Sequence, residues 1–183
     1  MALITPNHIT HFWFTAPMNK HWFKSTPEID LQIRNKYAQT WQDAFDGKLN
    51  HWKENPESCL ALILLLDQFP LNMFRGDPKC FASESISITL TLYGIAQNYD
   101  SHLSGPKLSF FYMPLMHSEL LEHQNLSIEK FESTGLEANT RFAKHHQKII
   151  QQFGRFPHRN KILGRESTTA ELNYLNSKEA FTG

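Results

Sequence analysis

Side chains that could bind an anion are concentrated between positions 153 and 165. This stretch supplies three arginines and one histidine: Arg155, His158, Arg159 and Arg165. An unpaired buried guanidinium is very costly, so these arginines must meet either carboxylates of the same chain or an anionic ligand. Gly154 and Pro157 indicate a helix end followed by a stiff turn. Fork-shaped donors on such a turn suit bidentate capture of a carboxylate or a phosphate.

Further candidate side chains occur at three other places in the chain. Asp67 ends the apolar run 59–66, where a carboxylate would be partly buried and paired with an arginine, and Arg75 follows on the next loop. His117 and Glu119 stand at the entrance of a predicted helix. His146 lies within an apolar helical stripe, where it is either a satisfied core histidine or a ligand. We expect Asp67, His117, His146 and Arg155 to surround one cavity.

Two functional classes fit these residues. In the first, a binding protein holds an anionic small molecule or a partner segment, with Arg75, Arg155, Arg159 and Arg165 as anion contacts. In the second, a hydrolase- or transferase-type enzyme uses the acid–base groups His117, Glu119, His146 and His158. No nucleophile motif or phosphate loop supports the enzyme. We therefore favour binding, while a purely structural arginine clasp on acidic groups of neighbouring helices is the third possibility.

Helix signals position these residues along the whole chain. Thr26-Pro27, Asn55-Pro56 and the capping-box patterns beginning at Thr134 and Thr168 predict helix starts. No run of strict apolar and polar alternation predicts a strand. The predicted helices span residues 7–14, 27–45, 56–69, 79–98, 118–131, 135–153 and 168–176. Their short connections favour an all-α fold of antiparallel helical hairpins, and no linker divides residues 1–183, so we expect a single domain.

Composition narrows the possible partners. Lys+Arg and Asp+Glu both number 18, so no global field attracts nucleic acid or an anionic membrane, and no nucleic-acid-binding module is recognisable. The longest apolar run has eight residues, against about 20 needed to cross a bilayer. Two cysteines without a leader-type N-terminus favour the cytoplasm. Glu119 and His123 share a helix face at i, i+4 spacing, but two ligands are a weak metal signal, and we expect neither metal nor cofactor.

Four motifs in order resemble the bacterial domain-of-unknown-function nine-two-four family. The first motif covers residues 65–76 and contains Asp67-Gln68-Phe69-Pro70 and Arg75-Gly76, and the second is Phe81-Ala82. The third covers residues 111–119 and ends in His117-Ser118-Glu119, and the fourth covers residues 153–165. Trp13-Phe14 and Trp22-Phe23 resemble its aromatic pairs near the start, and His146 matches its histidine before the last motif. Leu71 and Glu84 depart from the pattern, where arginine and aspartate are expected. The resemblance implies a tetratricopeptide-like stack of helices and no established activity.

Overall fold

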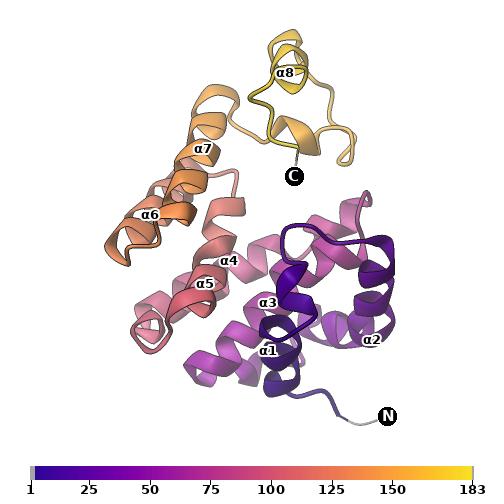
Figure 1. The fold of residues 1–183 in the computed structure, drawn as a ribbon, viewed down its shortest axis with the longest axis vertical. Coiled ribbons are helices and arrows are strands. Elements are labelled where there is room, and N and C mark those ends of the chain that lie inside the picture. Colours follow the sequence, from indigo (N-terminus) through magenta and orange to yellow (C-terminus); the bar gives the residue numbers. More distant parts are fainter. Residues whose placement is uncertain (1–2, 183) are drawn as a thin grey trace. The chain divides into compact units, whose positions relative to one another are not determined.

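The computed structural model describes residues 3–182, and these residues form eight α-helices, five short 3-10 helices and no strand. The predicted all-α class is confirmed (Figure 1). The helices are α1 (Pro6–Phe14), α2 (Pro27–Phe45), α3 (Pro56–Met73), α4 (Glu84–Ala96), α5 (Gly105–His117), α6 (Leu121–Ser133), α7 (Glu137–Phe153) and α8 (Thr169–Leu175). None of these described helices is long and apolar enough to cross a membrane.

The chain forms two compact units. The first comprises residues 3–75 and 79–114, and the second comprises residues 76–78 and 115–182. The single domain and the tetratricopeptide-like stacking of hairpins both stay predictions.

Helix starts follow the predicted capping residues in three cases. Thr26 and Asn55 accept hydrogen bonds from backbone amides at the starts of α2 and α3, and Thr168 forms a capping box with Glu171 at α8. The capping box predicted at Thr134 was wrong. The Thr134 hydroxyl donates to carbonyls of the preceding helix, and α7 begins without a side-chain cap.

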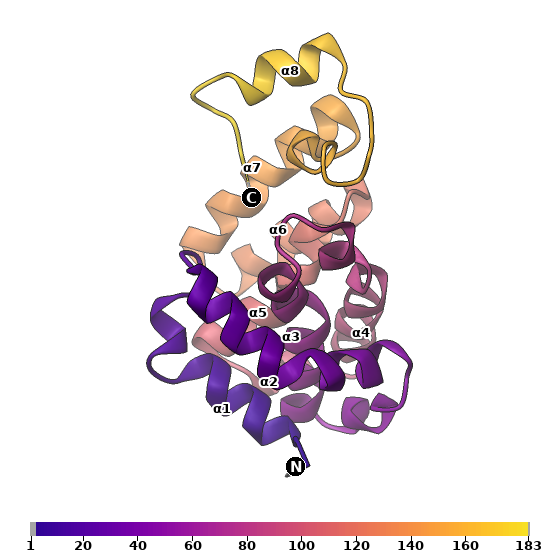
Figure 2. The ribbon, with the colours of Figure 1, turned by 90° about the vertical axis from the view of Figure 1, so that its right-hand side faces the viewer.

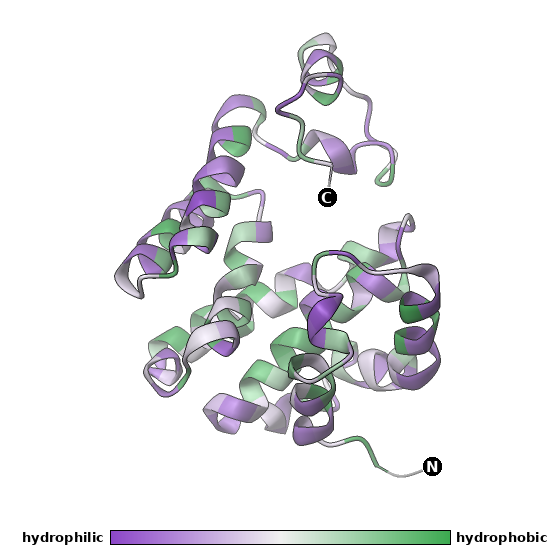
Figure 3. Cartoon of the chain, viewed as in Figure 1, coloured by the Kyte–Doolittle hydropathy of each residue, from purple (hydrophilic) through white to green (hydrophobic). Residues whose placement is uncertain are grey.

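Helix α3 is the buried centre of the first unit. Its residues from Cys59 to Pro70 are all buried, and α1, α2 and α4 pack around it (Figures 1 and 2). Its apolar colouring contrasts with the largely hydrophilic α7 in Figure 3. The helix was expected to end at position 69, before Pro70, but it continues to Met73.

A side chain from outside the helix compensates for Pro70. Proline has no backbone N–H, so the Leu66 carbonyl, four residues earlier, loses its helical donor. The Ser83 hydroxyl donates to this carbonyl at 2.5 Å and also accepts a hydrogen bond from Trp41 Nε1 at 3.1 Å. A donor from a distant position therefore allows α3 to continue past a proline that, from the sequence alone, predicts the end of the helix.

Helix α5 was missed from the sequence, and the helix expected over residues 79–98 is shorter. Pro106 and Pro114 interrupt the helical pattern, yet Gly105–His117 is one helix with Pro114 inside it. Residues 78–81 form the 3-10 helix η3 (Pro78–Phe81), and α4 begins at Glu84. Pro106 lies in the first turn of α5, where backbone N–H groups have no intrahelical partner, whereas Pro114 lies in the last turn and removes the donor to the Phe110 carbonyl.

In the second unit, α6 and α7 form an antiparallel hairpin. Gln147 Nε2 donates to Asn125 Oδ1 at 2.6 Å, and Lys144 pairs with Glu132 at 2.6 Å, so the two helices run in opposite directions. The predicted stripe of α7 is buried at Ala143, His146, Ile149 and Ile150. Phe142, an apolar residue predicted to belong to the same stripe, is instead 58% exposed.

Candidate functional site

The turn after α7 is formed as the sequence predicts. Gly154 adopts the left-handed conformation at φ 70°, and its N–H bonds to the Ile150 carbonyl at the helix end. The 3-10 helix η5 (Pro157–Arg159) follows directly. Glycine adopts this conformation without a Cβ penalty. Gly154 thereby turns Arg155 and the residues after it away from the axis of α7.

Arg155 binds a carboxylate of α8. Its Nε donates to Glu171 Oε1 at 2.7 Å and its Nη2 to Glu171 Oε2 at 2.9 Å, a bidentate pair. Nη2 also reaches the Glu166 carbonyl at 2.8 Å. The backbone N–H of Thr168 donates to the same carboxylate at 2.7 Å. The bonds from Arg155 are the main reason why the pKa of Glu171 falls to about 2.

Arg165 binds a second carboxylate, that of Glu119. Nη1 and Nη2 of Arg165 donate to the two Glu119 oxygens at 2.8 and 2.9 Å, and the Phe156 N–H donates to Oε1 at 2.8 Å. Burial of Glu119 favours its neutral form, but these donors outweigh it and hold its pKa below the ordinary value. We call the four side chains of the two pairs, Arg155–Glu171 and Arg165–Glu119, the arginine clasp.

Arg159 serves the end of a helix. It is only 6% exposed, and its Nη2 donates to the His117 carbonyl at the end of α5 at 2.8 Å. Gln124 Nε2 donates to the adjacent Met116 and Ser118 carbonyls at 2.8 and 2.6 Å. The last carbonyls of a helix lack intrahelical donors and carry partial negative charge, so a buried cation there is favourable.

Two neutral histidines lie beneath an aromatic ring. His146 is 4% exposed and its Nδ1 contacts the Phe142 carbonyl at 2.8 Å, the geometry of an Nδ1–H donor. Burial lowers the pKa of His146 to about 4. Burial, with the charge of Arg159, lowers the pKa of His158 to about 3. The Phe181 ring packs on both imidazoles, with centroid distances of 4.4 Å to His146 and 4.9 Å to His158.

Two of the predicted site residues lie in the first unit. Asp67 is buried at 5% exposure and accepts a hydrogen bond from Gln68 Nε2. Arg75 donates through Nε to Asp30 Oδ2 at 2.8 Å and through Nη2 to Asn72 Oδ1 at 3.4 Å. Arg75 therefore joins the loop after α3 to the first turn of α2.

The second unit contains the other predicted site residues: His117, Glu119, His146, Arg155, His158, Arg159 and Arg165. The structure connects them through the arginine clasp, the α5 end and the histidine pair. The single cavity that would add Asp67 to them stays a prediction. Glu119 and His123 face different partners, since His123 Nδ1 contacts Ser118 Oγ at 2.9 Å. Among residues 3–182, no group of three or more His, Cys, Asp or Glu side chains has the arrangement of a metal site.

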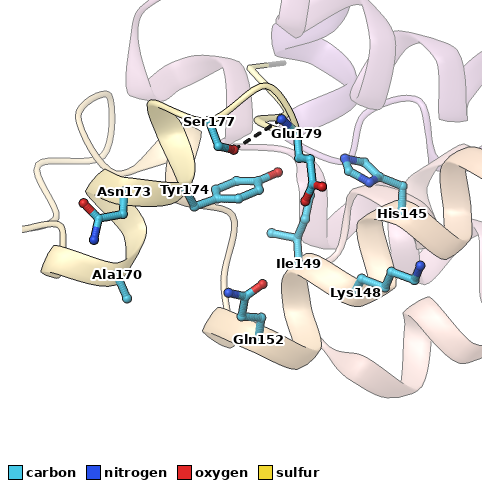
Figure 4. A pocket seen from close by; sticks show the side chains of 9 residues that line it. All are labelled: His145, Lys148, Ile149, Gln152, Ala170, Asn173, Tyr174, Ser177 and Glu179. Atoms are coloured by element: carbon cyan, nitrogen blue, oxygen red, sulfur yellow. Dashed lines mark hydrogen bonds between the residues drawn. The ribbon is translucent and has the colours of Figure 1, made fainter.

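A groove of about 490 Å³ between α7 and α8 was not predicted from the sequence (Figure 4). His145, Lys148, Ile149 and Gln152 line it from α7, and Ala170, Asn173, Tyr174, Ser177 and Glu179 line it from α8 and the residues after it. Figure 4 shows the Glu179 side chain reaching toward Ile149 of α7. Lys148 places a cation on the α7 wall, and His145 adds an imidazole beside it. The i, i+3, i+4, i+7 spacing of the α7 residues shows in the sequence that they share one helix face. No sequence pattern shows that α8 and the residues after it lie opposite that face.

Three comparisons relate the chain to known proteins. Residues 9–179 match the model of a family described as bacterial protein of unknown function (DUF924). A solved structure of a protein of unknown function from Agrobacterium tumefaciens is similar, with 34% identity and a TM-score of 0.88 over 93% of this chain and 96% of that chain. No curated protein matches the chain.

Proposed function

This chain belongs to the DUF924 family of bacterial proteins of unknown function, and we propose that it is a binding protein that takes an anionic group in the α7–α8 groove. The anionic group belongs to a small molecule or to a partner segment. The observation that carries the proposal is the groove between α7 and α8, which has Lys148 and His145 on one wall and amide and hydroxyl groups among its other lining side chains. A concave site with a few polar groups is the usual form of a ligand site.

The arginines are poor candidates for the same task. Arg155 and Arg165 each hold a glutamate bidentately, and Arg159 holds a helix end. An incoming anion would have to displace a carboxylate that already has three or more donors. The clasp thus favours a structural role for the arginine turn, and Lys148, an exposed ammonium in the groove, is the better anion contact.

Acid–base catalysis draws less support. With pKa values of about 4 and 3, His146 and His158 are neutral and weakly basic at neutral pH. The Ser118–His123 contact has the residue types of a nucleophile and its base. Ser118, however, is 2% exposed, and its Oγ also accepts the Leu120 N–H at 3.1 Å, as a capping group does. The enzyme stays an alternative prediction.

Titration with succinate tests the proposed site. Sodium succinate should raise the melting temperature more than sodium chloride at equal ionic strength, because a ligand of the native state stabilises it by mass action. Lys148→Gln should weaken succinate binding by about two- to fivefold, the effect of one exposed charge. Glu179→Gln should strengthen it by a similar factor, because the Glu179 carboxylate competes with the anion for the α7 wall.

Arg141→Gln is the matched control, since Arg141 is an exposed cation of α7 outside the groove. It should bind succinate as the unaltered protein does. Equal succinate affinity in Lys148→Gln and the unaltered protein would exclude the groove as the anion site.

A further inference from the structure

The segment after α8 folds back onto α7. We call Ser177–Phe181 the α8 extension. Its Phe181 ring meets the His146 and His158 rings edge to face, at interplanar angles of 61° and 88°. The same ring packs against the cluster formed by Ile149, Ile150 and Phe156. We call His146, Phe156 and His158 the aromatic socket, because their rings surround Phe181 on the α7 side.

Two residues before Phe181, the extension presents an acidic side chain to the groove. Glu179 lines the α7–α8 groove together with Lys148 and His145, and Figure 4 shows it reaching toward α7. The groove is thus already facing one carboxylate of its own chain. The extension combines an acidic residue in the groove that Lys148 lines with an aromatic residue in the socket, and a single residue separates the two in the pattern Glu-Ala-Phe.

Besides the packing of the Phe181 ring, hydrogen bonds to Tyr174 hold the extension in this position, one of them from the Ser177 N–H to the Tyr174 carbonyl at 2.9 Å. The Phe181 N–H donates to the Tyr174 hydroxyl at 2.9 Å, and the Glu179 N–H donates to Ser177 Oγ within the extension itself. Ser177, Lys178 and Glu179 are exposed, and Ala180 and Phe181 are only half-buried. Segments with few buried contacts and exposed backbone open at low free-energy cost.

The socket also contains a polar atom that the extension does not satisfy. Nδ1 of His158 is buried and has no hydrogen-bond partner among the described residues. A buried polar atom left unsatisfied disfavours the state that buries it. An occupant that makes the same contacts without the short connection to α8 has freedom to adjust to the socket, so an external segment can compete with the extension.

We propose that the α7–α8 groove and the aromatic socket form a docking site for a partner protein segment of the pattern acidic–any–aromatic, and that the α8 extension occupies this site as an internal competitor. The proposal rests on the proposed function, since the acidic residue of the partner takes the place of the anion beside Lys148. The edge-to-face geometry of the socket selects an aromatic side chain over an aliphatic one.

The full chain with Phe181→Ala tests the proposal. A fluorescent hexapeptide with the sequence of residues 177–182, Ser-Lys-Glu-Ala-Phe-Thr, is titrated with each protein, and its anisotropy is measured. Phe181→Ala should bind this peptide at least tenfold more tightly than the unaltered protein, because the internal ring no longer fills the socket. The peptide carrying Phe181→Ala should lose at least tenfold in affinity, and the peptide carrying Glu179→Gln about two- to fivefold.

Phe142→Ala is the matched control, because Phe142 is an exposed aromatic residue of the same helix outside the socket. It should bind the peptide as weakly as the unaltered protein. If Phe181→Ala does not fold, as judged by circular dichroism, Phe181→Leu keeps apolar volume without the ring and replaces it in the comparison.

Equal peptide affinity in Phe181→Ala and the unaltered protein would overturn the internal competition. Equal binding of the alanine-bearing peptide would overturn the aromatic requirement, and thereby the proposed docking site. If succinate binds through Lys148 while no peptide does, the further inference fails and the proposed function stands. If neither binds, both fail.

Discussion

Single residues of the arginine clasp hold distant parts of the second unit together. Glu119 lies just after α5, and its donors Phe156 and Arg165 follow α7, so one carboxylate ties two segments about 40 residues apart. Glu119→Gln should lower the free energy of unfolding by about 1–3 kcal/mol, because it leaves a half-buried guanidinium without its charged partner. Urea denaturation followed by circular dichroism measures the change.

Glu122→Gln serves as the comparison, since its side chain is 78% exposed one position into α6. Surface changes of this kind stay within about 0.5 kcal/mol. Equal losses in the two variants would show that the Glu119 pair contributes no more than an exposed charge.

The sequence showed that the arginines need anionic partners, but it left those partners unidentified. Glu171 is 16 positions from Arg155, and Glu119 is 46 positions from Arg165. Arg159 donates to a backbone carbonyl, and a carbonyl has no side-chain signature in any sequence. Tertiary packing decides which carboxylate each arginine meets. Residue types alone therefore predict that an arginine needs a partner, but they do not identify the partner.

At the scale of helices, the connection from Ser83 to α3 is the contact with the clearest energetic consequence. Ser83→Ala removes the donor to the Leu66 carbonyl and the acceptor for Trp41 Nε1, both of them buried. Leaving a buried polar group unsatisfied costs about 1–3 kcal/mol. We expect Ser83→Ala to lower the free energy of unfolding by at least this amount in urea denaturation.

Ser85→Ala is the comparison, because it removes a hydroxyl from an exposed position of α4 two residues after Ser83, and it should change the free energy of unfolding little. A Ser83→Ala protein as stable as Ser85→Ala would contradict the role assigned to the Ser83 hydroxyl.

Most helices were predictable because their signals are local. Capping residues located the starts of α2, α3 and α8, and apolar spacing located α7 to within a few positions. The failures came where a proline overrode the pattern: α3 continues past Pro70, and α5 contains Pro114. In α3 a side chain 13 positions after the proline restores the missing hydrogen bond, and such long-range compensation is invisible to local rules.

For the molecule as a whole, His146 and His158 make stability depend on pH between pH 5 and 6.5. Their pKa values are depressed in the folded state, to about 4 for His146 and about 3 for His158, while unfolded imidazoles titrate near the ordinary 6.5. Below pH 6.5 the unfolded chain therefore binds more protons than the folded one. The free energy of unfolding consequently decreases as the pH is lowered. Between pH 6.5 and 5 the expected loss is on the order of 1–2 kcal/mol per histidine.

Melting temperatures between pH 5 and 8 measure this dependence. The double variant His146→Gln/His158→Gln should flatten it, whereas His102→Gln, at an exposed position, should leave it unchanged. Glu119 and Glu171 have depressed pKa values, so their stabilisation is lost only below about pH 4.5, outside this window. A pH profile with the same slope in the double variant would show that the imidazoles are not buried as neutral groups.

The all-α class and the family were both accessible from the sequence, since they rest on composition, spacing and four ordered motifs. The α7–α8 groove was not, because its second wall comes from α8 and the α8 extension. The groove exists because Phe181 packs against α7. The sequence contains 14 phenylalanines, and nothing in it shows where this one packs.

The dependence of α3 on Ser83 also constrains the order in which substitutions at positions 70 and 83 of this chain can accumulate. While Pro70 is present, the Leu66 carbonyl needs the Ser83 hydroxyl, so losing the serine first passes through a destabilised intermediate. Replacing Pro70 first restores a backbone N–H, after which loss of Ser83 disturbs only the Trp41 indole. Ancestral reconstruction should therefore place the loss of the proline before the loss of the serine in any lineage that has lost both.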